Sequence, residues 1–396
     1  MTEKVMLLLV GGRSATPALM GALQFIHEVN RVKFLLCEHK DDQYLTFQKI
    51  IMRLLRVSQP DLLCDDVRDV KTVDGNNFDQ VTTAVTQLCA DISDLHFVNL
   101  TSVPQSMSFA VYHYLHDKHP QALPFSIYTH KSQLIPLASG KKTQRLTKKL
   151  TVDQYVTACD TAVFQYKFDV KRLSCTPEQA VAVAGELAEN IAQTDKLLAI
   201  IRKAGENIKT PKTIHINKLN LSKHVDNEDL RRFMQRLYEA GLISRFTEQD
   251  TRFSYRVETQ HDHAFLYGDW LEYYVYLQAK EAGFDSVKMA VELKDFKGEI
   301  DLIAVHNANA LICECKTGKF SSTDLARLES KAIKLGGNYC VRLFISTAQK
   351  AENDPGFEKL CRQAANRRIV VVTGDDLPQI EKKLKREMEQ PTYSRT

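Results

Sequence analysis

The feature that most limits the possible folds is a regular alternation of apolar runs with amphipathic segments through the first 130 residues. The expected strands are Val5–Val10, Val32–Cys37, Val67–Val73, His96–Leu100 and Pro124–Thr129. The expected helices, with apolar positions three and four apart, are Thr16–Val29, Tyr44–Val57, Phe78–Cys89 and Ser106–Leu115. This alternation predicts an α/β, Rossmann-like fold, in which helices cover both faces of a parallel sheet.

The chain has 396 residues, which is more than one core of ordinary size, so we expect several domains. Pro177–Ala204 is a long helical stretch, and the helix at Asn227–Ala240 followed by a hairpin at Phe246–Val257 is typical of a winged-helix-like module. A structural linker is the alternative for this region. A second α/β pattern starts near His261. We therefore predict an N-terminal domain at 1–150, a connector at 151–260 and a C-terminal domain at 261–396.

Composition narrows the class of protein. The nine cysteines include no C-x-x-C pair and no Cys/His cluster with zinc spacing, which predicts a reduced, cytoplasmic protein. No apolar run reaches the roughly 18 residues that cross a bilayer, so we expect no membrane partner. The net charge of +4 permits nucleic-acid binding without arguing for it, because a local patch matters more than the total.

Charged residues interrupt two consecutive strand-like segments of the C-terminal part, Gly-Glu-Ile-Asp301 and Leu-Ile-Cys-Glu314-Cys-Lys316. Because side chains alternate along a strand, Glu314 and Lys316 share a face, and a hairpin can bring Asp301 opposite Glu314. Two such carboxylates, with a backbone carbonyl near Cys315, form an oxygen site for Mg²⁺ or Mn²⁺. The Lys316 ammonium can orient a water or stabilise charge on a phosphate. The alternative is an ordinary Glu/Lys pair on a solvated strand.

This segment resembles the PD-(D/E)xK restriction-endonuclease-like fold over about Gly268–Ser346. In that pattern a helix with a Glu precedes a strand with the Asp and a strand with the E-x-K, and Glu272, Asp301, Glu314 and Lys316 match in order. The resemblance implies metal-dependent hydrolysis of phosphodiester bonds. Asp301 and Glu314 would bind metal, Lys316 would assist the water, and Glu272 would bind or orient a second metal.

Two loops of the N-terminal part follow expected strands, where ligands of parallel sheets bind. The first opens a helix, so its backbone amides can cradle a phosphate, although a tight strand–helix turn is the alternative. The candidate ligand-binding residues are Gly11, Gly12, Arg13, Ser14, Ala15 and Thr16 in the first loop and Asn99, Thr101, Ser102, Gln105 and Met107 in the second.

The second loop resembles the signature N-x-T-G-G-T-K-x-M of the CARF family, the CRISPR-associated Rossmann fold. Asn99, Thr101 and Met107 match, whereas Ser102, Val103, Pro104 and Gln105 replace Gly, Gly, Thr and Lys. Without glycines the backbone approaches a ligand less closely, and without the Lys a charge for phosphate is lost. We therefore expect a changed ligand identity or affinity.

The order of a CARF-like domain, a connector and a PD-(D/E)xK domain resembles the cyclic-oligoadenylate-activated nucleases of type III CRISPR antiviral defence. That resemblance implies a homodimer that binds cyclic tetra-adenylate, or cyclic hexa-adenylate, across its interface and is activated allosterically. It also implies a nucleic acid substrate: single-stranded DNA, single-stranded RNA or supercoiled DNA. Two alternatives are a non-catalytic nucleotide-sensing regulator that binds DNA through the middle module, and an enzyme whose sensor opens its own ligand's ring.

Overall fold

The structure is a computed structural model that describes residues 3–206, 212–220, 225–294, 296, 298–350 and 354–392. The chain divides into two compact units. One unit is Met1–Val163 together with Val305–Ala310, and the other is Phe164–Ala304 together with Leu311–Thr396. No helix among the described residues is long and apolar enough to cross a membrane.

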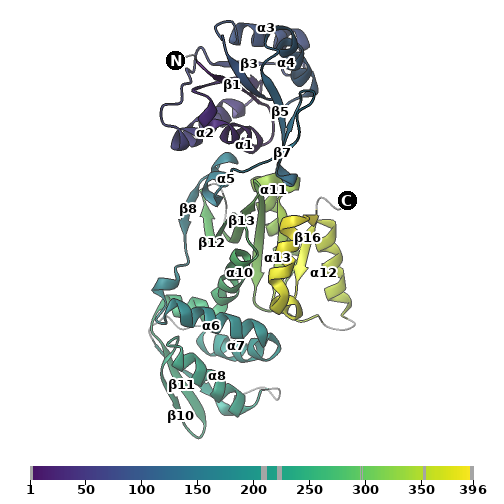
Figure 1. The fold of residues 1–396 in the computed structure, drawn as a ribbon. Coiled ribbons are helices and arrows are strands. Elements are labelled where there is room, and N and C mark those ends of the chain that lie inside the picture. The colour runs from purple at the N-terminus through teal and green to yellow at the C-terminus, as the bar shows by residue number, and fades with distance from the viewer. Residues whose placement is uncertain are drawn as a thin grey trace. The chain divides into compact units, whose positions relative to one another are not determined.

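The first unit is built on a seven-stranded sheet with the order β3-β2-β1-β4-β5-β6-β7 (Figure 1). Its parallel strands are β1 (Val5–Val10), β2 (Arg31–Cys37), β3 (Val70–Val73), β4 (Leu95–Asn99) and β5 (Leu123–Tyr128), and the antiparallel ones are β6 (Gln133–Pro136) and β7 (Gln144–Arg145). Its helices are α1 (Thr16–Gln24), η1 (Ile26–Glu28), α2 (Gln43–Ser58), α3 (Phe78–Leu88), α4 (Gln105–Lys118), η2 (Thr129–Lys131) and α5 (Val152–Ala158).

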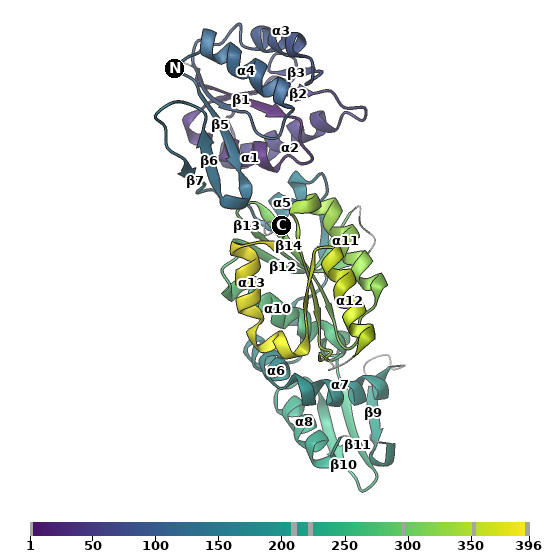
Figure 2. The ribbon, with the colours of Figure 1, turned by 90° about the vertical axis from the view of Figure 1, so that its right-hand side faces the viewer.

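Helices cover both faces of this parallel sheet, as the alternating sequence predicts. The pair α1 and α2 packs on one face, and the pair α3 and α4 packs on the other, around a core from β1, β2 and β4 (Figure 2). The strand order changes direction between β1 and β4, because β2 and β3 lie on one side of β1 and the later strands β4 and β5 lie on the other. The loops that follow these two strands therefore lie side by side at the switch point, where such folds bind ligands.

Two of the element boundaries that differ from the prediction in this unit have a clear physical reason. The helix expected at Thr16–Val29 ends at Gln24, because Phe25 leaves the helical conformation (φ −116°, ψ 13°) and a 3₁₀ turn follows. The strand expected from Val67 begins only at Val70. Before it, the buried Asp69 carboxylate pairs with Arg31, so the chain turns to satisfy a charge and does not continue the strand.

The second unit contains a six-stranded sheet with the order β16-β15-β14-β13-β12-β8. Its strands are β8 (Val163–Tyr166), β12 (Ser286–Leu293), β13 (Glu299–His306), β14 (Asn309–Lys316), β15 (Val341–Ser346) and β16 (Ile369–Val372). The helices around it are α9 (Gln260–Ala264), η5 (Phe265–Asp269), α10 (Trp270–Glu281), α11 (Ser322–Gly336), η6 (Gly337–Tyr339), α12 (Pro355–Asn366), η7 (Gly374–Gln379) and α13 (Ile380–Glu389). The helix α10 packs against α13, and α11 packs against β15 and α12.

A small three-stranded sheet with the order β10-β11-β9 belongs to the same unit. Its elements are η3 (Val170–Arg172), α6 (Pro177–Glu189), α7 (Ile191–Gly205), β9 (Lys212–Asn217), η4 (Lys218–Asn220), α8 (Asn227–Glu239), β10 (Ser244–Glu248) and β11 (Arg252–Val257). The order helix, strand, helix, hairpin is that of the expected winged-helix-like module. The single helix expected at Pro177–Ala204 is wrong in one respect, because Asn190 leaves the helical conformation and separates α6 from α7.

The three-part division at residues 150 and 260 stays a prediction. One segment of the expected connector does not stay apart from the C-terminal domain, since β8 forms the edge of the six-stranded sheet. The helices α6 and α7 also share one hydrophobic core with that sheet.

Candidate functional site

The hairpin of β13 and β14 positions the first two predicted site residues. Asn307 and Ala308 form its two-residue turn, and both have positive φ angles, of 49° and 61°. A two-residue turn sets Asp301 across from Glu314 in the facing strand. The Cys315 backbone N–H donates to Asp301 Oδ2 at 2.6 Å, which fixes this carboxylate against β14.

Glu314 and Lys316 face α11, as the strand alternation predicts. Glu314 Oε2 accepts from Lys331 Nζ at 2.6 Å, and Lys316 Nζ lies 2.7 Å from Asp324 Oδ2. Cys313, which precedes Glu314, is buried in the core on the opposite face of the sheet, and the intervening Cys315 packs partly buried against the same core. One strand therefore presents an acid and a base to one helix and an apolar side to the other.

Glu272 reaches this site from α10. A π-helical segment with a conformational break at Gly268 precedes the helix, and π-helical turns are frequent at functional sites. Burial raises the pKa of Glu272 well above its usual value, and the charges of Asp301 and Asp269 add to this effect. The rise shows that a helix distant in sequence brings its carboxyl among the strand carboxylates.

The carboxylates destabilise one another in their ionised forms. Burial and the neighbouring Glu314 raise the pKa of Asp301 to about 7, while the charge of Lys331 opposes the rise. Burial also raises the pKa of Asp269, one turn before Glu272, to about 6. Repulsion of this kind is relieved by a cation, and carboxylate oxygens are the ligands that Mg²⁺ and Mn²⁺ prefer.

The donor set therefore fits a divalent metal in its chemistry. Within the described ranges, no three His, Cys, Asp or Glu side chains are grouped closely enough to hold an ion as they stand. Binding an ion would require the carboxylates to draw together. The charge imbalance, more than a preformed cage, is what this structure shows.

Sequence reasoning missed four residues near these carboxylates. Asp269, Asp324 and Lys331 come from helices, and Lys167 follows β8, with its Nζ 3.3 Å from Glu299 Oε2. A signal existed for the two residues on α11. Asp324 and Lys331 are seven apart and lie along the same side as the buried Leu328 and Leu335, where an amphipathic helix normally has apolar residues.

The two predicted sensor loops meet at the switch point of the first unit. A side chain at Gly12 would come within 2.8 Å of Ser102 Cβ and 3.0 Å of the Ser102 carbonyl oxygen, and one at Gly11 would meet Val103 at 3.2 Å. Tyr44 Oη also donates to the Gly11 carbonyl at 2.9 Å. The glycines therefore allow the close approach of the two loops.

Ser102 adopts the conformation that glycine normally provides. Its φ is +60°, in the left-handed region, at the first of the two glycine positions of the CARF signature. The loop thus keeps its backbone path despite the substitution. We expect a loop without glycines to approach a ligand less closely, and this stays a prediction. The φ angle of Ser102 does not support it, because Ser102 holds the left-handed conformation that glycine favours.

Several predicted ligand-binding residues support the loops from beneath. The buried Asn99 donates to the Pro17 carbonyl at 3.2 Å and accepts from the Thr101 N–H at 3.0 Å. Thr101 Oγ1 in turn accepts from the Ile127 N–H at 2.8 Å. Met107 is fully buried beside Cys37. These side chains hold the loop in shape.

Other residues of the two loops are available to a ligand. Arg13, Ser102 and Gln105 are exposed, and Ser14 is half-buried. Ala15 and Thr16 are buried at the start of α1. The Thr16 hydroxyl finds no hydrogen-bond partner among the described residues. This leaves one basic side chain and several small polar groups for an anionic ligand.

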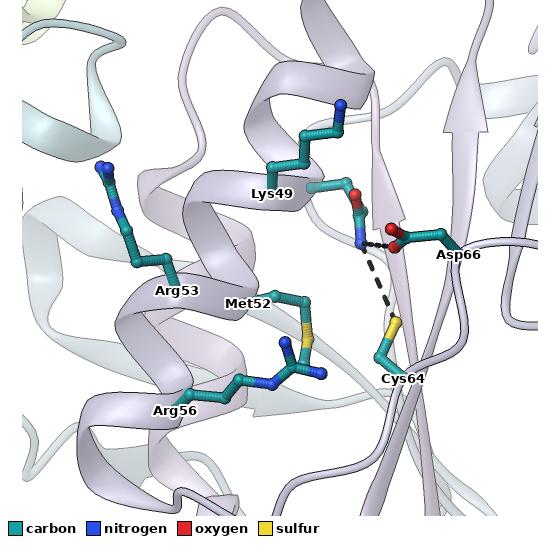
Figure 3. Close-up of a pocket in the computed structure, with 7 residues that line it drawn as sticks. Lys49, Met52, Arg53, Arg56, Cys64 and Asp66 are labelled. Carbon is teal, nitrogen blue, oxygen red and sulfur yellow. Dashed lines mark hydrogen bonds between the residues drawn. The ribbon is translucent and has the colours of Figure 1, made fainter.

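A separate hollow of about 360 Å³ lies on the outer side of α2 (Figure 3). Lys49, Arg53 and Arg56 project from the helix, and Gln48 hydrogen bonds to Asp66 at 3.4 Å. None of the predicted ligand-binding residues lines it. The hollow is therefore distinct from the loops at the switch point.

Known proteins resemble this chain in sequence over its C-terminal part and in fold over nearly its whole length. Residues 259–390 match the family model of the Card1-like endonuclease domain. Protein VC1899 from Vibrio cholerae has a similar structure, with a TM-score of 0.78, 15% identity and 98% of each chain covered. Can2 from Sulfobacillus thermosulfidooxidans, solved in complex with cyclic tetra-adenylate, gives a TM-score of 0.71 at 16% identity, over 96% of this chain and 98% of that one.

A type III CRISPR defence DNA nuclease activated by cyclic oligoadenylate is also similar, with a TM-score of 0.52 at 12% identity. The match covers 90% of this chain and 48% of that nuclease. No curated protein sequence matches the chain. At these identities the likeness concerns the fold.

The chain therefore shares its overall fold with VC1899 and Can2, and its C-terminal part is also similar in sequence to an endonuclease domain. The part of the chain that is similar to the Card1-like endonuclease domain contains Glu272, Asp301, Glu314 and Lys316.

Proposed function

We propose that the protein is a metal-dependent nuclease of type III CRISPR defence that hydrolyses phosphodiester bonds in DNA or RNA. Cyclic tetra-adenylate, bound by a homodimer of the CARF domain, is its activator. The observation that carries the proposal is the mutual repulsion of Asp301, Glu314 and Glu272 beside Lys316, because a buried acidic cluster of this kind is costly unless a cation uses it.

Asp301, Glu314 and Glu272, with the Cys315 carbonyl, would hold Mn²⁺ or Mg²⁺. The bound ion supplies Lewis-acid stabilisation of the phosphoryl oxygens and an acidified water at neutral pH. The chain's own residues hold the ligands in place. The Cys315 N–H holds Asp301 at 2.6 Å, and the hairpin turn fixes the Asp301–Glu314 pairing.

Lys316 is the residue proposed to act on the scissile phosphate. Its side chain is 40% exposed and lies 2.7 Å from Asp324, so it can meet a substrate without leaving the surface of the site. Burial would raise the pKa of Asp324, but hydrogen bonds from Lys316 and Ser321 outweigh burial and lower it. An ionised Asp324 therefore orients the Lys316 ammonium, as charge stabilisation requires.

The loops after β1 and β4 are the proposed ligand site. The small residues Gly11, Gly12 and Ser14 are partly exposed, Arg13 supplies a charge for phosphate, and the buried Thr16 hydroxyl at the start of α1 has no partner among the described residues. A solved protein of similar fold, Can2, was crystallised with cyclic tetra-adenylate. A ligand with two-fold symmetry is best bound by two copies, which is the reason for proposing a homodimer.

The charges of the winged-helix-like module argue against the regulator alternative. A DNA-reading helix needs unpaired basic side chains. On α8, Arg231 and Arg232 both pair with Glu228, and Arg236 pairs with Glu186. These exposed pairs reduce the positive charge that α8 presents, which makes the helix a weaker candidate for reading bases.

The test is a cleavage assay with purified full-length protein, Mn²⁺, and single-stranded DNA, single-stranded RNA or supercoiled plasmid, each with and without cyclic tetra-adenylate. Glu314→Gln is the control variant, because it removes the charge and keeps the shape. We expect cleavage that requires the ligand and is lost in the variant.

The other outcomes separate the parts of the proposal. Cleavage that ignores the ligand but is lost in Glu314→Gln would keep the nuclease and reject this activator. Absence of cleavage with every substrate, metal and cyclic oligoadenylate would reject the enzyme assignment and favour a binding role. Size measurement with and without ligand tests the homodimer separately.

A further inference from the structure

Lys331 is a cation placed among the carboxylates that the proposed chemistry leaves without a role. Its Nζ donates to Glu314 Oε2 and to the Glu299 carbonyl oxygen, both at 2.6 Å. The Lys331 side chain is 11% exposed. A single ammonium on α11 therefore binds both β13 and β14 beside the residues proposed to hold the metal.

The position of Lys331 on its helix indicates that its charge is there to balance the carboxylates. The buried side of α11 is mostly apolar, with Leu325, Leu328, Ala332 and Leu335, and Asp324 is the charged residue among its buried positions. An apolar residue would hold the helix there at a lower desolvation cost than an ammonium. The Lys331 ammonium lies 2.6 Å from Glu314 Oε2, in a side chain that is 20% exposed. It is thus the monovalent counter-ion of the acidic cluster.

We propose that Lys331 is a placeholder cation, which balances Glu314 when no metal is bound and competes with the divalent ion for that carboxylate. The proposal rests on the proposed metal-dependent nuclease and adds a control on its metal loading. An ammonium held at 2.6 Å uses part of the acceptor capacity of Glu314 Oε2, and its charge repels an incoming divalent ion. Because Lys331 lies on α11 and Glu314 on β14, the competition depends on the position of this helix against the sheet.

The test compares Mn²⁺ binding by calorimetry in full-length wild-type protein and in Lys331→Gln, without nucleic acid. We expect Lys331→Gln to bind Mn²⁺ about tenfold more tightly, because a unit charge a few ångströms from the ion is removed. Lys331→Arg, which keeps the charge, should stay close to wild type. Arg327→Gln removes an exposed charge one turn earlier on α11 and should leave binding unchanged.

Binding by Lys331→Gln that equals or falls below the wild-type affinity would overturn the proposal. An equal increase in Arg327→Gln would also overturn it, because the effect would then be one of overall charge. If Lys331→Gln fails to fold by circular dichroism, Lys331→Met keeps the aliphatic stem and gives the same comparison.

The two levels of the argument remain distinguishable. If neither wild-type protein nor Glu314→Gln binds Mn²⁺, the metal site and the placeholder role of Lys331 are both rejected. If wild-type protein binds Mn²⁺ and cleaves, and Lys331→Gln binds Mn²⁺ with the same affinity, only the placeholder role of Lys331 is rejected. In the expected case the half-saturating Mn²⁺ concentration for cleavage also falls in Lys331→Gln, in parallel with the binding constant.

Discussion

In the C-terminal unit, charged side chains enter a buried sheet, whereas the loops after β1 and β4 in the N-terminal unit contain one charged side chain, Arg13. At the nuclease strands the chemistry lies in carboxylates whose pKa values are raised by burial and by one another. At the loops, Gly11 and Gly12 let the two backbones approach each other closely, and Ser102 holds a left-handed backbone conformation. The comparison teaches that the proposed metal site depends on the charge of side chains, whereas the proposed anion site depends mainly on the path of the backbone.

The largest effect is expected from Asp301→Asn. The amide keeps the size of the side chain and can still accept from the Cys315 N–H, but it removes a proposed metal ligand. Metal catalysis supplies several kcal/mol of transition-state stabilisation, so cleavage should fall at least about 1,000-fold. Ligand binding by the CARF domain should not change. Cleavage rates and cyclic tetra-adenylate affinity measured on the same preparation check both halves.

The same variant tests the electrostatic side of the comparison through pH. Since the pKa of Asp301 is raised from 3.8 to about 7, the folded protein holds a proton in this range that the unfolded chain has lost. The stability contributed by this group therefore falls as pH rises from about 4 to 7, by at most about 1.4 kcal/mol per pH unit. In EDTA, the melting temperature of Asp301→Asn should exceed that of wild type by a margin that grows between about pH 4 and pH 7 and levels off above it. A constant margin would contradict the raised pKa.

The next effect concerns the sensor loops, where glycine size should matter and charge should not. Gly12→Ala places a methyl group within 2.8 Å of Ser102 Cβ, so the two loops must separate slightly. We expect cyclic tetra-adenylate to bind about tenfold more weakly, a change of about 1.4 kcal/mol. Gly185→Ala, whose added methyl group meets nothing within 4 Å, is the matched control. Mn²⁺ binding should be the same in both variants, and equal ligand affinities would remove the loop contact from the argument.

The sequence predicted the nuclease strands well because their signal is local. Alternation along one strand is enough to place Glu314 and Lys316 on a common face, and their contacts with Lys331 and Asp324 on α11 confirm it. It did not predict Lys331, since its role depends on how α11 packs on the sheet. It also missed β8, which joins the sheet from a distant part of the chain. Such pairings follow from tertiary packing, which no local pattern encodes.

The sensor domain shows the opposite balance. Its strand order and helix layers follow from the alternation of apolar runs, but the parts played by individual loop residues do not. Asn99 and Met107 match the CARF signature, yet their side chains are fully buried and support the loop. A signature lists residues that keep a backbone path as well as those that touch a ligand, and only the fold separates the two kinds.

The smallest effect tests whether the backbone path, more than the side chain, is what Ser102 provides. A left-handed conformation costs a non-glycine residue roughly 1 kcal/mol, so Ser102→Gly should be more stable than Ser102→Ala by about that amount. Both variants lose the hydroxyl, and only the alanine keeps the strain, so the difference between their unfolding free energies isolates the backbone. Equal stabilities would mean that the loop relaxes when the side chain changes. The loop site would then not depend on a fixed backbone path, and its contrast with the carboxylate site would no longer hold.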